Sequence, residues 1–545
     1  MRLFTATVTS ILASAAFGQA TLTPRDTTDE GRPPPAIERF EPVLDAWWQD
    51  AVFYEVFVRS FADSTTGPLA GDGIGDLRGL IERLDYLNDG DPETDTDLGV
   101  TALWLMPITD SPSYHGYDTT DYRLIEPDYG TNEDFLEFME ACRARGIRVI
   151  IDLVLNHCSR DHEWFQRAAA GDERYRDWFL WRDDHPGWRG PWNQPVWHER
   201  NGEFYYGIFW GGMPDLNYEN PAVTAEMLDV IRFWLEDMQI DGFRMDAIRH
   251  LIEDGQQQDN TPATHAWLRE YFDFVKATKT DAVSVGEVWS PTDDVSRYVG
   301  DQMDLAFEFW LAESIVTSVR DRTAAPFREA MDKVNDSYPT GMYATFLRNH
   351  DQPRVMHALS GNRDAARLAA AIQFALPGVP FIYYGEEIGM SADKPDPQIR
   401  TPMQWTAGSN VGFSSATPWI EPKPDSSSVN VALQTDDPLS LLSFYRDLID
   451  LRRGNETLRK GALIPLETSD DRALAFLREH EGDRVLCVFN LTDEPLSGVR
   501  VRPRGFSPRE ALGADLLAGA DAPNLHRRPL ELAPRAAHYF PVARR

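Results

Sequence analysis

Cysteine is scarce in this sequence, which excludes a disulfide framework. The 545 residues contain three cysteines, Cys142, Cys158 and Cys487, at widely separated positions. An odd number leaves at least one thiol free unless two chains pair through it. We therefore predict three buried small side chains without a metal or redox role.

Positive charge and long apolar runs are also in short supply. Lys and Arg number 53 against 87 Asp and Glu, so the formal net charge is -34 and the pI is near 4.7. Nucleic acids and anionic membranes attract basic surfaces, so this balance argues against both as partners. After residue 20, no stretch approaches the roughly 20 apolar residues that span a bilayer. We expect a neutral substrate, no membrane contact and a monomer.

The first 45 residues predict an exported protein with a flexible leader. Residues 1–20, MRLFTATVTSILASAAFGQA, combine one Arg, a short apolar centre and a small-residue end, which is typical of a secretory signal. A disordered cytosolic tail is the alternative. Residues 21–45 are rich in Pro and charge and predict a linker. The expected location is therefore secreted or periplasmic.

The middle of the chain alternates predicted strands and helices. The first strand is expected at Ala51–Phe61, the following helix at Leu77–Leu87, and a strongly apolar strand at Arg148–His157. Eight such alternations predict an α/β fold, a closed parallel (β/α)8 TIM barrel, built from residues 46–157 and 221–455.

Two other regions break this alternation. Residues 158–220 contain seven Trp among many Gly, Asp and Arg and show no clean helical period, so we predict a loop-rich insertion, domain B, after the third strand. Its aromatic rings suit either sugar faces or a small core of its own. From residue 456 to 545, short alternating strands predict a C-terminal antiparallel β-sandwich.

The stretch DGFRMDAIRH, residues 241–250, places two charges in an otherwise apolar strand. Side chains two apart on a strand share a face, so Arg244 and Asp246 should point together. Barrels of this kind carry their chemistry at the carboxyl ends of the strands. A neighbouring Arg favours an ionised carboxylate, so we predict that Arg244 holds Asp246 charged. A structural Arg–Asp bridge is the alternative.

Polar residues gather at the carboxyl ends of other predicted strands. They are Asp152, Asn156 and His157 after the third strand, Glu287 after the fifth, and Asn349, His350 and Asp351 after the seventh. Several carboxylates meeting at one barrel mouth are hard to explain by structure alone. A pair of them, one ionised and one kept protonated by an apolar setting, is the minimum equipment for glycoside hydrolysis.

The motifs DLVLNH, GFRMDAIRH, GEVW and NHD, together with MPDLN at residues 213–217, resemble the α-amylase family, glycoside hydrolase family 13. The ordered set is highly specific and spans nearly the whole chain after the signal. The resemblance implies that Asp246 is the nucleophile, Glu287 the general acid/base and Asp351 the carboxylate that grips the sugar. A retaining mechanism needs its two carboxyl groups about 5 Å apart with opposite protonation states.

The same resemblance implies a sugar subsite around these carboxylates. Its other residues would be Tyr117, His157, Arg244 and His350. The segments HGYD and RTPMQW are similar to those of relatives in which an Asp and an Arg, here Asp118 and Arg400, close the floor of the first subsite. A closed floor would favour chain ends, and an ordinary surface salt bridge is the alternative.

Two places resemble the calcium sites of the family. One set matches positions that hold calcium between barrel and insertion in many α-amylases: Asn156, Asp215 and His250. A second set lies in the loop of residues 63–79: Asp63, Asp72, the Ile74 carbonyl and Asp76. This loop is similar to a DxNxDGxGD calcium loop but has extra residues after its first Asp, and oxygen ligands of this kind suit calcium. A glycine-rich turn without an ion is the alternative.

The resemblance implies a secreted retaining hydrolase of α-1,4 bonds in α-glucan or malto-oligosaccharides, of α-amylase or α-glucosidase type. Ala247 stands where α-1,6-preferring relatives often carry Val, which favours α-1,4 cleavage. Water and sugar compete for one glycosyl-enzyme, so transglucosidase or trehalose synthase activity stays open. A non-catalytic transporter-subunit relative is a third interpretation, and the complete carboxylate set argues against it.

Overall fold

A computed structural model describes residues 46–502, 512–519 and 529–543 of the chain. The predicted signal and linker lie outside the described residues. In the described part, no helix has the length and apolar character needed to cross a membrane. Cys142, Cys158 and Cys487 are free and buried, which confirms their interpretation as buried small residues.

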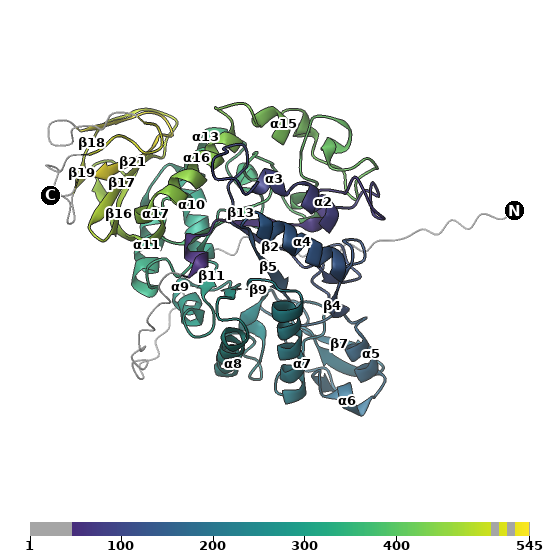
Figure 1. Cartoon of the computed structure of the whole chain (residues 1–545). Helices are drawn as coiled ribbons and strands as arrows, with labels where there is room; N and C mark the ends of the chain where they lie inside the picture. Colours follow the sequence, from purple (N-terminus) through teal and green to yellow (C-terminus); the bar gives the residue numbers. More distant parts are fainter. Residues whose placement is uncertain (1–45, 503–511, 520–528, 544–545) are drawn as a thin grey trace, which may run out of the picture. The chain divides into compact units, whose positions relative to one another are not determined.

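Eight parallel strands form the central sheet, in the order β11-β10-β9-β5-β2-β1-β13-β12. They are β1 (Phe53–Val56), β2 (Ala102–Leu105), β5 (Arg148–Leu153), β9 (Gly242–Met245), β10 (Val283–Gly286), β11 (Leu305–Ala306), β12 (Ala344–Thr345) and β13 (Val379–Tyr383). A parallel bridge between Phe307 and Ala344 joins the two edges of this sheet. The predicted parallel barrel is therefore confirmed, with strands β2, β5 and β9 at the centre of Figure 1.

Helices follow the strands around the barrel (Figure 1). The longer ones are α4 (Asn132–Ala144), α7 (Pro221–Arg232), α8 (Pro262–Thr278), α10 (Phe309–Asp321), α11 (Ala325–Ser337), α13 (Arg363–Phe374) and α16 (Leu441–Gly454). The shorter ones are α1 (Val58–Phe61), α2 (Leu77–Glu82), α3 (Leu84–Leu87), α9 (Thr292–Val295), α12 (Val355–Ala358), α14 (Asp396–Ile399), α15 (Val431–Gln434) and α17 (Glu456–Lys460). Helix α4 begins with a capping box between Thr131 and Asp134, and α7 and α8 begin with Pro, where the missing N–H costs nothing.

The barrel interior explains why the functional residues lie at its mouth. Phe53, Ile150 and Val285 belong to a buried apolar cluster that fills the barrel. Because side chains two apart share a face, the next inward positions are Glu55, Asp152 and Glu287. Each strand thus changes from apolar to charged within one step along the same face.

The prediction for the first strand, Ala51–Phe61, is wrong at its carboxyl-terminal end. Only Phe53–Val56 is extended, and Val58–Phe61 turns into the short helix α1. The β-rich sequence hid this turn, which lets Ser60 donate to the Arg400 carbonyl at 2.6 Å. The helix expected at 77–87 is also divided, because Arg83 leaves helical geometry between α2 and α3.

The insertion after β5 is more ordered than its sequence predicted. It contains α5 (Glu163–Ala169), α6 (Glu173–Arg176) and a three-stranded antiparallel sheet of β6 (Trp181–Arg182), β8 (Glu203–Tyr206) and β7 (Trp197–Arg200). Trp178 and Trp197 are buried within it, whereas Trp192 and Trp210 are exposed. The core interpretation therefore holds for some of the Trp residues and not for others. A further antiparallel pair, β3 (Thr109–Asp110) and β4 (Asp121–Ile125), precedes α4.

The C-terminal region consists of antiparallel sheets. They are formed by β14 (Ala462–Pro465), β15 (Glu467–Thr468), β16 (Ala473–His480), β17 (Asp483–Asn490), β18 (Leu496–Val499), β19 (Val501–Arg502), β20 (Leu530–Leu532) and β21 (Ala537–Val542). The largest has the order β14-β16-β17-β21, with β15-β19 and β18-β20 as two smaller pairs. The Tyr539 hydroxyl donates to the Ala371 carbonyl of α13 at 2.5 Å, so this sheet contacts the barrel helices.

Candidate active site

One buried arginine joins three carboxylates at the barrel mouth. Arg244, with a side chain 1% exposed, lies 2.7 Å from Asp152, 2.7 Å from Asp246 and 2.8 Å from Glu287. The carboxylates come from β5 and from just beyond β9 and β10, so three neighbouring strands supply the cluster. The predicted shared face of Arg244 and Asp246 is confirmed. A simple two-residue bridge does not describe this arrangement.

Burial governs the protonation of the two central carboxyl groups. Burial raises the pKa of Asp246 to about 6, although the Arg244 charge opposes this rise. With this pKa, Asp246 is ionised at neutral pH but not in mild acid. The prediction that Arg244 holds Asp246 charged did not include the effect of burial. Burial also raises the pKa of Glu287, and the charges of Asp246 and Asp351 add to it against Arg244.

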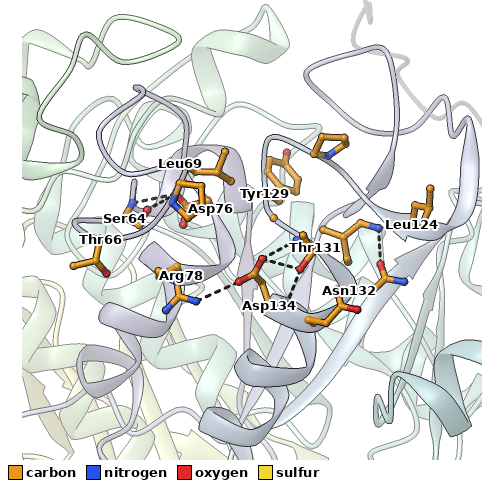
Figure 2. A pocket seen from close by; sticks show the side chains of 15 residues that line it. Ser64, Thr66, Leu69, Asp76, Arg78, Leu124, Tyr129, Thr131, Asn132 and Asp134 are labelled. Carbon is orange, nitrogen blue, oxygen red and sulfur yellow. Dashed lines mark hydrogen bonds and ion pairs between the residues drawn. The ribbon is translucent and has the colours of Figure 1, made fainter.

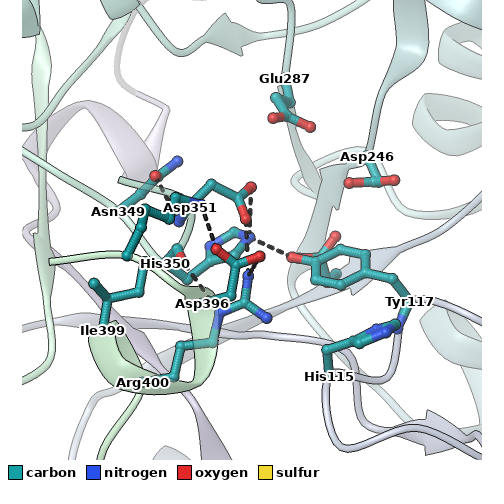
Figure 3. Close-up of polar contacts among 12 residues, drawn as sticks. His115, Tyr117, Asp246, Glu287, Asn349, His350, Asp351, Asp396, Ile399 and Arg400 are labelled. Carbon is teal, nitrogen blue, oxygen red and sulfur yellow. Dashed lines mark hydrogen bonds and ion pairs between the residues drawn. The ribbon is translucent and has the colours of Figure 1, made fainter. Parts of the chain in front are cut away.

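Asp351 is the most strongly ionised of the predicted trio. Burial acts to raise its pKa, but His350 and Arg400 lower it well below the usual value. His350 Nε2 lies 3.1 Å from one oxygen of Asp351, and Arg400 donates to the other at 2.8 Å. Figure 3 shows Asp351, His350 and Arg400 together, with Asp246 and Glu287 across the mouth.

Tyr117 links the two halves of this cluster. Its hydroxyl lies 2.6 Å from His350 Nε2 (Figure 3). The same hydroxyl donates to Asp152 at 3.0 Å. His157 packs behind it, with Nε2 2.9 Å from the Tyr117 carbonyl. Burial lowers the pKa of His157 to about 4, so its ring is neutral at pH 7. The structure thus brings Tyr117, His157 and His350 together, as the motifs predicted.

In the described structure Asp118 and Arg400 form no direct ion pair, so the alternative of an ordinary salt bridge between them is wrong. Arg400 pairs with Asp351 and lies 3.7 Å from Asp396. Asp118 instead accepts hydrogen bonds from the hydroxyls of Ser111, at 2.8 Å, and Ser113. Sequence reasoning did not weigh these local serines, which both donate to Oδ1 of Asp118. A closed subsite floor formed by Asp118 and Arg400 stays a prediction.

Glu55 is a site residue that sequence reasoning missed. Its carboxylate lies 2.5 Å from His350 Nδ1, inside the barrel. A signal was available, because Glu55 is a lone charge in the apolar run AVFYEVFV, on the same strand face as Phe53. An isolated carboxylate on the inner face of a barrel strand requires a partner.

Comparison with known proteins identifies the family. Residues 55–461 match the model described as α-amylase, catalytic domain, and residues 465–536 match that of the maltogenic amylase C-terminal domain. The chain belongs to the α-amylase family, glycoside hydrolase family 13. It is therefore a glycoside hydrolase of that family.

Relatives of this family member have names that describe different activities. It is 39% identical over 457 residues to Alpha-amylase 3 of Dictyoglomus thermophilum, covering 82% of this chain and 86% of that protein. It is 36% identical to Trehalose synthase/amylase TreS of Mycolicibacterium smegmatis, covering 86% and 88%. The crystal structure of an α-amylase from H. orenii superimposes with a TM-score of 0.79 at 36% identity and covers 90% of this chain and 99% of that one.

The first calcium set of this α-amylase family member contains buried oxygens without partners. Asn156 Oδ1 and Asp215 Oδ2 have no hydrogen-bond partner within the described residues, and the same holds for Glu253 Oε1 and the Tyr206 hydroxyl. Burial, with the charge of Glu253, raises the pKa of Asp215 well above its usual value. Buried oxygens left unsatisfied fit a hard cation. The sequence did not single out Glu253.

The third residue of that set is already engaged through its ring. His250 Nδ1 lies 2.7 Å from the Gln258 carbonyl, and Nε2 lies 2.9 Å from Arg249 Nε. Among the described residues, no group of three or more His, Cys, Asp or Glu side chains is arranged to hold a metal. A cation here would therefore depend on amide, carbonyl or hydroxyl oxygens as well as carboxylates.

The second calcium set fits an ion less well. Asp63 accepts from the Gly71 and Gly73 amides at 2.8 and 2.9 Å. Asp72 accepts from the Ile74 amide at 2.8 Å, and Asp76 caps α2 by accepting from the Gly79 amide at 2.7 Å. These carboxylates already have donors, as a glycine-rich turn supplies them.

Asp76 also lines a surface pocket of about 510 Å³ between this loop and the start of α4 (Figure 2).

Proposed function

We propose that this protein is a secreted retaining hydrolase of α-1,4-glucosidic bonds in malto-oligosaccharides. The observation that carries the proposal is the Arg244 guanidinium shared between Asp246 and Glu287. The shared guanidinium makes these two carboxyl groups neighbours at the barrel mouth. This arrangement supports the short separation of about 5 Å that a retaining mechanism needs.

In this proposal Asp246 attacks the anomeric carbon and Glu287 protonates the departing glycosidic oxygen. Water then attacks the anomeric carbon of the glycosyl-enzyme and displaces Asp246, while the ionised Glu287 takes a proton from that water. The pKa of about 6 for Asp246 leaves it ionised at pH 7. Asp351, with a lowered pKa, stays charged and would bind sugar hydroxyls. Asp246 and Asp351 thus have the charge states that their roles require, and the raised pKa of Glu287 favours the protonated form that an acid needs.

Exposed aromatic rings support a sugar as the substrate. Trp289, two residues after Glu287, is 42% exposed and stacks on Phe309 with ring centroids 4.6 Å apart. Trp192 stacks on Phe209, whose ring lies 5.2 Å from that of His157. Flat rings of this kind pack against the apolar faces of sugars. We assign them to glucose units on either side of the cleaved bond.

Glucosyl transfer is the second candidate function. The same intermediate would react with a sugar hydroxyl instead of water if an acceptor is held near Glu287. The relative named Trehalose synthase/amylase supports this alternative. The exposed Trp289 offers a surface for such an acceptor.

We also propose that calcium occupies the partner-free oxygens of Asn156 and Asp215, with Glu253 and Tyr206 as further oxygen donors. These residues come from the end of β5, from the insertion and from the turn after β9, so the ion would tie the insertion to the barrel. Export through the segment 1–20 and a monomeric state complete the proposal. Both rest on the sequence alone.

The deciding experiment follows the products of reducing-end-labelled maltoheptaose and of unlabelled maltose. Hydrolysis predicts glucose and shorter oligosaccharides of retained anomeric configuration. Stepwise loss of single glucose units indicates a closed first subsite, and an early spread of labelled maltose and maltotriose indicates an open cleft. Conversion of maltose to an isomer without glucose release would reject hydrolysis in favour of transfer. Comparable rates on maltotriose and isomaltotriose would reject the α-1,4 preference.

A further inference from the structure

Glu55 occupies a position where a barrel strand is normally apolar. It lies on β1 in register with Trp104 of β2 and Tyr383 of β13, and it is 2% exposed. Its Oε1 lies 2.5 Å from Nδ1 of His350, which is fully buried. The Trp104 ring meets the His350 ring edge to face with centroids 5.6 Å apart, and the Tyr117 ring stacks on the His350 ring at the same centroid distance. Glu55 therefore contacts the site through His350.

The hydrogen bonds around His350 account for its protons. Tyr117 has one hydroxyl proton, which it donates to Asp152. The Tyr117 oxygen must then accept from His350 Nε2, which lies 2.6 Å away. On the other side of the ring, the Glu55 carboxylate can only accept, so Nδ1 must also carry a proton. A ring with both nitrogens protonated is an imidazolium cation.

We propose that Glu55 is a positioning residue that keeps His350 as an imidazolium, whose Nε2–H holds Tyr117 and Asp351 in place in the sugar subsite. Two carboxylates flank the ring, with Glu55 on Nδ1 and Asp351 3.1 Å from Nε2. Either nitrogen alone could be satisfied by a neutral ring. Both together require the cation.

The charged groups around the ring agree with this assignment. They are Glu55 from β1, Asp351 from the segment after β12, Tyr117 from the segment after β3, Asp152 from β5, and Arg400, which donates to the His350 carbonyl at 3.0 Å. Burial acts to lower the pKa of His350, but Asp351 and Glu55 raise it to about 9. The cation is therefore present below about pH 9 and is lost as the pH rises through that value.

The charge of His350 affects how the site holds the groups that bind sugar. An imidazolium donates a stronger hydrogen bond to a hydroxyl than a neutral ring does. Its charge also keeps Asp351 ionised. Without the charge of Glu55, the Nδ1 proton loses its anionic acceptor and the pKa of His350 falls, because Glu55 is one of the two carboxylates that raise it. The inference rests on the proposed glycosidase site, but the state of His350 can be measured without turnover.

The test separates the charge of Glu55 from its position. Glu55→Gln keeps an oxygen that accepts from Nδ1 and removes the negative charge. Histidine is labelled with ¹⁵N, and the His350 signal is identified as the one missing from His350→Asn. We expect its titration midpoint to fall by at least about 1 pH unit in Glu55→Gln, since a paired opposite charge shifts a pKa by about 1–3 units. The basic limb of kcat/KM on maltotriose should move down with it.

Two further variants make the result decisive. Glu308→Gln is the matched control, because Glu308 is a buried glutamate held by Thr292 and Tyr338, each at 2.8 Å, away from His350. It should leave the His350 midpoint unchanged. Glu55→Asp retains the charge and should keep the midpoint closer to that of the wild type, even if activity falls. If maltotriose is not a substrate, the NMR titration still decides.

An unchanged His350 midpoint in folded Glu55→Gln would overturn the proposal. An unchanged pH profile with a lowered melting temperature would assign Glu55 a purely structural role, and so would equal losses in Glu55→Gln and Glu308→Gln. If Glu55→Gln does not fold, Glu55→Asp supplies the titration. A midpoint near 6.5, the ordinary value for histidine, in that charge-retaining variant would then contradict the proposal.

Discussion

Two sets of buried arginines show how differently this chain uses the same side chain. Arg244 at the barrel mouth and Arg452 and Arg478 near the C-terminal sheets are each at most 1% exposed. Arg244 faces three carboxylates, and despite burial they raise its pKa well above the usual value. Burial lowers the pKa of Arg452 to about 9 and that of Arg478 to about 10. The three arginines are equally buried, yet the pKa is raised for Arg244 and lowered for Arg452 and Arg478.

The hydrogen bonds explain the difference. In the described structure, Arg452 donates to main-chain carbonyls at the end of α13, including those of Leu376 and Gly378 at 2.7 and 2.8 Å. Arg478 donates to the Ala375 and Gly461 carbonyls at 2.5 and 2.6 Å. Helix ends leave such carbonyls unsatisfied, so these arginines act as caps. The arginine at the mouth instead sets the charge of reacting groups.

The largest effect should come from removing the proposed nucleophile. Asp246→Asn keeps the shape of the side chain but removes the covalent route, so we expect turnover of maltotriose to fall by about 10⁴-fold or more. The melting temperature should change little. The substitution removes the contact of Asp246 with Arg244, but it also removes a buried negative charge, and the two effects oppose each other. Retention of more than about a tenth of wild-type turnover would reject this role.

The second effect depends on the leaving group. Glu287→Gln removes the proton donor, so we expect a loss of about 10²–10⁴-fold on maltotriose and a much smaller loss on an aryl α-glucoside with a good leaving group. Initial rates on the two substrates provide the measurement. Equal losses on both would count against Glu287 as the acid.

A pair of substitutions tests the two arginine classes directly. Arg244→Lys replaces a rigid fork by a point charge, so we expect a loss of activity of about 10²-fold or more. Arg452→Met leaves helix-end carbonyls unpaired and should reduce stability by about 2–4 kcal/mol, with kcat unchanged. Denaturant unfolding and steady-state kinetics on both variants are the readouts. A catalytic defect in Arg452→Met at a temperature where it is folded would break the distinction.

The acid limb of the pH profile reports the charge of Asp246. The pKa of about 6 means that the carboxylate is lost as the pH falls through that value. Activity should therefore decline about tenfold per pH unit below the limb. Since Asp351 contributes to the raised pKa of Asp246, Asp351→Asn should move the limb of the residual activity to lower pH. An acid limb at the same pH in Asp351→Asn would show that Asp351 does not raise the pKa of Asp246.

The smallest effect should be that of calcium. A ligand that binds only the folded state stabilises it by mass action, so a chelator should lower the melting temperature by a few degrees, on the order of the 2–4 °C per kcal/mol expected for a large domain, and added calcium should restore it. Asp215→Asn should abolish the calcium response. Asp72→Asn, in the loop whose carboxylates already have donors, is the matched control and should retain it. If calcium no longer changed the melting temperature of Asp72→Asn but still changed that of Asp215→Asn, the calcium site would lie in the loop of Asp72.

The sequence determined the fold class and the identity of the central cluster. Alternation with a period of two placed Arg244 and Asp246 on one face, and the ordered motifs brought Glu287, His350 and Asp351 to the same barrel mouth. These inferences succeeded because each depends on local periodicity or on the fact that parallel strands end on one side. A short turn such as Val58–Phe61 could not be predicted in the same way, because its residues favour strands.

Only the tertiary structure decided which charges meet. Glu55 and His350 are 295 positions apart in the chain, and no periodicity predicts their contact. Asp118 is satisfied by nearby serines instead of Arg400, and burial outweighs Arg244 in setting the pKa of Asp246. Partner choice depends on three-dimensional distance, and desolvation depends on everything packed around a group. The sequence supplies the charged groups, and the folded barrel sets their pairing and their protonation.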